Sequence, residues 1–81
     1  MSRSIREIAK EIREDWSKSK GGVWYGAKPY LAAMFSLDSM GDVYGMDNAK
    51  SVILYFLSNA QTWRGEVARR VKKELNAMVK G

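Results

Sequence analysis

The sequence contains neither cysteine nor histidine, and these two absences exclude several kinds of chemistry. Without cysteine there can be no disulfide, no zinc–thiolate site and no thiol nucleophile. Without histidine the chain lacks the commonest metal ligand and the usual general base near neutral pH. We therefore predict a protein that is not an enzyme, and we expect it to use no metal ion and no organic cofactor.

Long apolar runs are missing as well. No unbroken run exceeds the six positions of residues 52–57, whereas a membrane-spanning helix needs about 20. No apolar segment of the signal-peptide type follows the first residues. These features predict a soluble, cytoplasmic protein with no membrane partner.

The composition that remains is typical of a small globular protein. Its 81 residues are 46% hydrophobic and 11% aromatic, which predicts one domain, residues 1–81, with a thin core. Fourteen basic residues against nine acidic ones give a net charge of +5. This surplus favours anionic partners, although net charge bears on association rather than on fold.

The first half of the chain predicts two helices. One apolar stripe with helical spacing indicates the first helix, and it consists of Ile5, Ile8, Ala9, Ile12 and Trp16. Ser2 or Ser4 can act as its N-cap, with Glu7 as the capping-box partner of Ser4. The second helix is expected to begin near Pro29, which suits a first turn, and to stop at Gly41.

The second half predicts two more helices. Residues 52–57 fit either a buried strand or a helix. We favour a helix with Asp47 as its N-cap, and because it is apolar on all sides we expect it to be buried. A last helix is expected from about Thr62 to about Met78. The predicted fold is all-α, a compact orthogonal or irregular bundle of about four helices with a buried third helix.

The last helix has an apolar face and a basic back. Its apolar arc contains Val67, Val71, Leu75 and Met78, which is typical of a core-facing helix. The basic residues make a stripe that is a candidate for contacts with nucleic-acid phosphates, namely Arg69, Lys72, Lys73 and Lys80. Glu66 and Glu74 dilute this stripe, and each can pair with Arg70 one helical turn away. A solvated face favoured by the helix macrodipole is the plainer explanation.

A DNA-reading helix-turn-helix is disfavoured. The segment "SNAQTWRG" between the last two predicted helices is longer than the usual turn of about three to four residues. Nor does the last helix begin with the residues that read bases in the major groove, since Arg64 and Glu66 flank a glycine there.

Arg64 raises a separate question. If it is helical it projects into the apolar arc, where an unpaired cation is costly. The sequence offers three partners for a structural clamp, Asp38, Asp42 and Asp47, and contact with a ligand is the alternative. A calcium loop is not expected from these three acids, because their spacing and the missing terminal glutamate do not fit.

Aromatic residues also suggest a binding surface. Trp24 and Tyr25 lie among glycines in "GGVWYGAKPY", where they can either close over the core or form an exposed recognition patch that stacks on a partner. The residues that we expect as candidates for contact with a partner are Trp24, Tyr25, Trp63 and Arg64.

Three strings resemble a group of small helical proteins encoded by bacteriophages, prophages and other mobile elements. The strings are "WYGAKPYLAAM", "DVYGMDNAKSVILYFLSNAQTWRG" and "ARRVKKELNAM", and together they cover most of the chain. The resemblance implies a phage or mobile-element origin and a location in the cytoplasm of a bacterial host. It implies no catalytic residue and no mechanism.

Two hypotheses of function follow. The first is an accessory protein that binds a host or phage protein, or another copy of itself, because the chain has many aromatics and methionines for so thin a core. The second is nucleic-acid binding through the basic face of the last helix.

Overall fold

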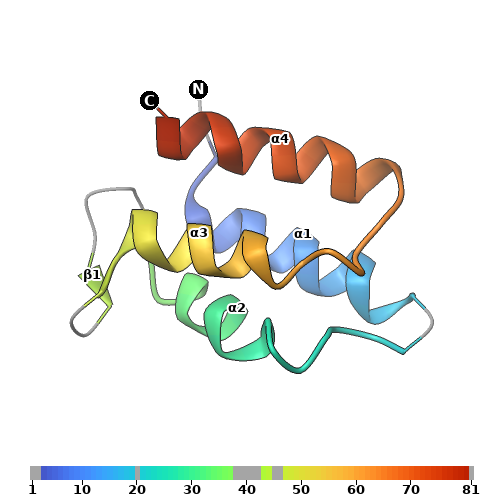
Figure 1. Ribbon diagram of the computed structural model, residues 1–81. Helices are drawn as coiled ribbons and strands as arrows, with labels where there is room; N and C mark the ends of the chain where they lie inside the picture. Colours follow the sequence, from blue (N-terminus) through green and yellow to red (C-terminus); the bar gives the residue numbers. More distant parts are fainter. Residues whose placement is uncertain (1–2, 20, 38–42, 45–46, 81) are drawn as a thin grey trace.

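Four helices build the part of the chain that the structure describes (Figure 1), and they confirm the predicted all-α bundle. The computed structural model describes residues 3–19, 21–37, 43–44 and 47–80, with the backbone alone for residues 43, 44 and 47. The helices are α1 (Ile5–Ser17), α2 (Lys28–Met34), α3 (Ala49–Ser58) and α4 (Glu66–Lys80). Two short strands, β1 (Val43–Tyr44) and β2 (Asp47–Asn48), pair antiparallel just before α3.

Helix α1 begins with the predicted capping box, and Ser4 is its N-cap. The Ser4 hydroxyl accepts a hydrogen bond from the Glu7 N–H at 3.1 Å, and the Glu7 carboxylate accepts one from the Ser4 N–H at 3.1 Å. The bond from the Ser4 backbone, followed by that with its side chain, lowers the pKa of Glu7. Two N–H groups that the first turn leaves free are thereby satisfied.

Three helix boundaries differ from the predictions. Helix α2 ends at Met34, so it is shorter than predicted, and the predicted stop at Gly41 lies outside the described residues. Asn48 caps α3 in place of Asp47, its side-chain oxygen accepting from the Ser51 N–H at 2.8 Å. Helix α4 begins at Glu66 rather than near Thr62. Gly65 has a φ of +113°, which is not helical, so the helix cannot extend back through it.

The core lies between the helices, and all four contribute to it. In Figure 1, α3 runs between α4 on one side and α2 on the other, with α1 alongside. Its aromatic centre consists of Trp16, Phe56 and Trp63, whose ring centroids lie 5.7–6.4 Å apart. Aromatic pairs at such distances add stability beyond the area that they bury.

Helix α3 is the central helix, as predicted, but the other helices leave one of its sides exposed to solvent. Val52, Ile53 and Phe56 are buried, whereas Leu54 and Tyr55 are 44% and 50% exposed. The helical interpretation of residues 52–57 is confirmed, and the open side of α3 becomes part of the surface described below.

Candidate functional site

The prediction that Trp63 contacts a partner is wrong, because this side chain is fully buried. It stacks on Trp16 with 5.7 Å between ring centroids, and its indole Nε1 donates to Asp15 Oδ2 at 2.9 Å. Because α4 begins only at Glu66, residues 59–65 form a connection that brings Trp63 under the end of α1. The tryptophan therefore fixes this connection to the core.

Arg64 is exposed and precedes α4, so it is not helical and does not project into the apolar arc. The proposed clamp with Asp38 or Asp42 lies outside the described residues, as does the side chain of Asp47. Among the residues that are described, no carboxylate forms an ion pair with Arg64. Its guanidinium remains a candidate for contact with a ligand.

Lys72 departs from the predicted basic stripe. The side chain is half-buried, and its Nζ donates to the Trp63 carbonyl at 2.7 Å and lies 5.8 Å from the centroid of the Trp63 ring. Burial lowers the pKa of Lys72, and the positive charge of Arg64 lowers it further. Lys72 therefore groups with Arg64 near the start of α4 and is less exposed than the other three basic residues of the predicted stripe, and its predicted contact with phosphate stays a prediction.

Arg69, Lys73 and Lys80 do lie exposed on α4, one to two turns apart, and they form what remains of the predicted stripe. We call these three residues the basic stripe. Within the described part of the chain, none of them pairs with a carboxylate.

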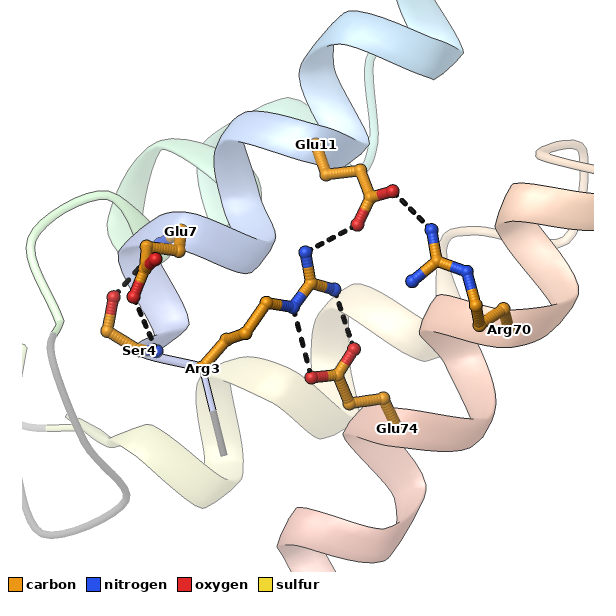
Figure 2. Close-up of polar contacts among 6 residues, drawn as sticks. All are labelled: Arg3, Ser4, Glu7, Glu11, Arg70 and Glu74. Carbon is orange, nitrogen blue, oxygen red and sulfur yellow. Dashed lines mark hydrogen bonds and ion pairs between the residues drawn. The ribbon is translucent and has the colours of Figure 1, made fainter. Parts of the chain in front are cut away.

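The predicted pairing of Arg70 with Glu66 and Glu74 is also wrong, because α4 pairs with the N-terminal segment instead. Figure 2 shows Arg3 between two carboxylates: Glu11 accepts from Nη1 at 2.6 Å, and Glu74 accepts from Nη2 at 2.6 Å and from Nε at 3.2 Å. Arg70 pairs with the second oxygen of Glu11. We call these four residues the ionic network.

The pKa shifts in the ionic network follow from these contacts. The hydrogen bond to Glu74 raises the pKa of Arg3, which burial opposes and Glu11 reinforces. Burial raises the pKa of Glu11, but hydrogen bonds from Arg70 and Arg3 outweigh it and the pKa is lowered. Since Glu11 and Glu74 are both occupied here, they do not neutralise the cations elsewhere on α4.

A second candidate surface consists of four exposed side chains and the half-buried Tyr30, which we call the aromatic surface. It contains Trp24, Tyr25, Tyr30, Leu54 and Tyr55. Trp24 and Tyr25 are 43% and 72% exposed, which agrees with the alternative of an exposed patch and not with that of a lid over the core, and their ring centroids lie 4.3 Å apart. Tyr30 on α2 packs on Tyr55 of α3 with 5.4 Å between centroids.

Trp24 lies near the end of α3, beyond Tyr55. It lines a hollow of about 240 Å³ together with Asn59 and Thr62, and Asn59 lies one helical turn after Tyr55. A Cβ on Gly26 would lie 2.6 Å from Trp24 Nε1 and 3.0 Å from Asn59 Oδ1. Only glycine at position 26 lets the indole lie so close to the backbone, so the exposed position of Trp24 is held by the fold.

Leu54 and Tyr55 were missed because the run 52–57 is apolar throughout. The residues one helical turn away from Leu54 and Tyr55 indicate that these two side chains face solvent. Lys50 and Ser58 lie one turn on either side of Leu54, and Ser51 and Asn59 lie one turn on either side of Tyr55. Polar residues at those spacings indicate a solvent-facing side.

The described residues show no site for a metal ion and no membrane span. Nowhere in them do three or more histidine, cysteine, aspartate or glutamate side chains gather as metal ligands. None of the helices that the structure describes has the length and apolar character needed to cross a membrane.

The chain matches no protein-family model, no curated protein and no solved structure. The geometry of the two surfaces is therefore what bears on function.

Proposed function

We propose that this protein is a small accessory protein that binds another protein through the aromatic surface. The observation that carries the proposal is the exposure of Trp24, Tyr25, Leu54 and Tyr55 in a chain whose core is already filled by other side chains. Tryptophan and tyrosine are enriched among the residues that dominate binding energy at protein interfaces. Exposed apolar patches on a small protein indicate such an interface, and the ring pairs Trp24–Tyr25 and Tyr30–Tyr55 are the contacts that build this one.

The chemistry of the partner follows from the residues around the aromatic pair. Lys28 is exposed and lines a hollow of about 490 Å³ together with Trp24, Tyr25 and Thr62. The chain as a whole carries a net charge of +5. We infer a partner segment with an apolar side chain flanked by carboxylates, because opposite charge at the rim speeds and orients association.

The biological origin and location that we propose for the protein depend on its resemblance to small phage and mobile-element proteins. It supports an origin in a phage, a prophage or another mobile element, a site of action in the bacterial cytoplasm, and a partner encoded by host or phage. Binding without catalysis is consistent with a chain that has neither cysteine nor histidine.

The test compares partner binding by two variants of the chain. In the first, Trp24 and Tyr55 are both replaced by Ser, and in the matched control Lys73 and Lys80 are both replaced by Ser. We expect a host or phage protein that crosslinks to the parent and to the control, and that fails to crosslink to the Trp24/Tyr55 variant. Equal crosslinking by all three would overturn the proposal.

Self-association through the same surface is an outcome of the same test. Sedimentation equilibrium of the parent and of the Trp24/Tyr55 variant measures it directly. A parent that is dimeric, with a variant that is monomeric, would identify a second copy of the chain as the occupant of the aromatic surface.

Nucleic-acid binding is the second candidate, and the basic stripe is the observation that favours it. Arg69, Lys73 and Lys80 are exposed on one helix without a paired carboxylate among the described residues. Titration of duplex DNA and of RNA at low and moderate salt tests it, with all three residues replaced by Gln. Binding that is insensitive to salt or to the triple substitution would rule it out, because phosphate contacts depend on both.

A further inference from the structure

The start of α4 forms a hollow that three cations line. It measures about 320 Å³ and is lined by Trp63, Arg64, Gly65, Ala68, Arg69 and Lys72. Its volume is near the lower end of the range of about 300–1,000 Å³ typical of small-ligand sites. We call it the cationic hollow.

The three cations differ in how they are held. Lys72 is fixed, because its Nζ donates to the Trp63 carbonyl at 2.7 Å, which leaves two further ammonium hydrogens for other acceptors. Arg64 and Arg69 are exposed on either side, one before the helix and one in its first turns. An ammonium fixed by a hydrogen bond and two exposed guanidinium groups along one hollow form a set of donors that can bind an anion.

No carboxylate of the described residues neutralises this cluster. Glu11 and Glu74 are occupied in the ionic network, and Asp15 accepts from the Trp63 indole. Glu66 lies next to the hollow in the sequence, but it is exposed and does not line it. Among the described residues, three like charges thus lie together with no carboxylate paired to them.

We propose that the cationic hollow is a binding site for a phosphate group, held by Arg64, Arg69 and Lys72. Guanidinium groups bind phosphate oxygens in pairs of parallel hydrogen bonds, and the ammonium adds a third donor. The charge of a dianionic phosphate matches the cluster better than a single carboxylate does. At the same place the first N–H groups of α4 lack partners within the helix, which adds to the attraction for an anion.

The lowered pKa of Lys72 is consistent with this site. Burial, followed by the charge of Arg64, lowers the pKa of the ammonium, and an anion bound beside it would favour its charged form. The inference does not depend on the aromatic surface, so its failure and the failure of the proposed protein binding are distinguishable. It shares Arg69 with the basic stripe, and the variants at Lys73 and Lys80 separate the hollow from the rest of that stripe.

The test is an NMR titration of the isotope-labelled full chain with inorganic phosphate, at constant ionic strength maintained with sodium chloride. We expect saturable shifts of the backbone amides of Trp63, Gly65 and Ala68. Replacing both Arg64 and Arg69 by Gln should weaken the affinity by about tenfold or more, because two charge-assisted donors are lost. Both side chains are exposed, so the variant should fold, and circular dichroism checks this.

The matched control replaces Lys73 and Lys80 by Gln. It removes the same amount of charge outside the hollow, so phosphate affinity should stay within about twofold of the parent, because neither side chain lines the hollow and exposed charges are partly screened by salt. Shifts that do not saturate, or equal losses in both double variants, would overturn the proposal and leave only a general attraction of anions.

Two further titrations identify the source of the phosphate. In one, a short DNA duplex replaces inorganic phosphate, and in the other a nucleoside monophosphate does. Shifts confined to the hollow with the monophosphate alone indicate a small phosphorylated ligand. Shifts with DNA that inorganic phosphate competes away indicate a nucleic-acid backbone. Either result supports the site, whereas no response at the hollow to any of the three would overturn it.

Discussion

Trp63 and Trp24 show how differently one residue type is used in this protein. The Trp63 side chain is fully buried, stacks on Trp16 and donates to Asp15, whereas 43% of Trp24 is exposed. The first holds the connection between α3 and α4 against α1, and the second has no comparable role in the core. We therefore assign Trp63 to stability and Trp24 to recognition.

Replacing Trp63 by Ala should lower the free energy of unfolding by about 3–5 kcal/mol, the usual cost of deleting a buried aromatic side chain. Replacing Trp24 by Ala should change it by about 0.5 kcal/mol or less, as for most surface positions. Urea unfolding followed by circular dichroism measures both. A Trp24 variant as unstable as the Trp63 variant would contradict the assignment of roles.

Replacing Glu11 by Gln should lower the free energy of unfolding by about 1 kcal/mol near neutral pH, because it breaks a partly exposed ion-pair network. The folded-state pKa of Glu11 lies below its ordinary value of 4.5. Its contribution is therefore fully present above that value and is lost as the pH falls through the folded-state pKa.

The measurement is urea unfolding of the parent and the Glu11 variant at about pH 7 and at about pH 2, with the difference vanishing at the lower pH. Replacing Glu14, an exposed acid of the same helix, by Gln is the control. If the two variants lose the same stability at neutral pH, the ionic network makes no special contribution.

Among the elements, the connection between α3 and α4, residues 59–65, determines which side chains are exposed at the start of α4. Gly65 adopts a φ of +113°, and a Cβ there would meet nothing within 4 Å. The backbone conformation alone therefore demands glycine. That conformation lets Trp63 turn inward while Arg64 stays exposed at the cationic hollow.

Replacing Gly65 by Ala should cost about 1–3 kcal/mol, the usual cost of a strained backbone conformation. It should also weaken phosphate binding at the cationic hollow, because Arg64 is attached to this residue. Replacing Thr62, an exposed residue of the same connection, by Ala is the control for both measurements. A Gly65 variant that unfolds and binds like the Thr62 variant would show that the positive φ is dispensable.

At the scale of the whole molecule, one core contains buried side chains from all four helices. A core shared in this way favours unfolding in a single cooperative step. It also leaves the aromatic surface and the basic stripe on the outside, so substitutions that affect binding there should be separable from stability.

Tryptophan fluorescence and circular dichroism should report the same unfolding midpoint in a variant with Trp24 replaced by Phe. In that variant the buried Trp16 and Trp63 are the remaining fluorescent tryptophans, so fluorescence follows the core while circular dichroism follows the helices. Coincident curves are the mark of two-state unfolding. Separated curves would contradict the prediction that residues 1–81 form one domain.

The sequence by itself determined the helices and the faces that they bury. The stripe from Ile5 to Trp16, the cap at Ser4 and the arc from Val67 to Met78 are all found as predicted. These features depend on residues within one or two helical turns of each other, so local spacing is enough to read them. The exposed pair of Trp24 and Tyr25 was among the predicted alternatives for the same segment.

Only the tertiary structure decided which polar and aromatic side chains are available to a partner. Trp63 is buried through a contact with Asp15, 48 residues away in the sequence, and Arg3 reaches Glu74, 71 residues away. Lys72 does not lie with the basic stripe, because its Nζ donates a hydrogen bond to the Trp63 carbonyl. Such contacts depend on how helices pack against each other, which the periodicity of a single helix does not encode.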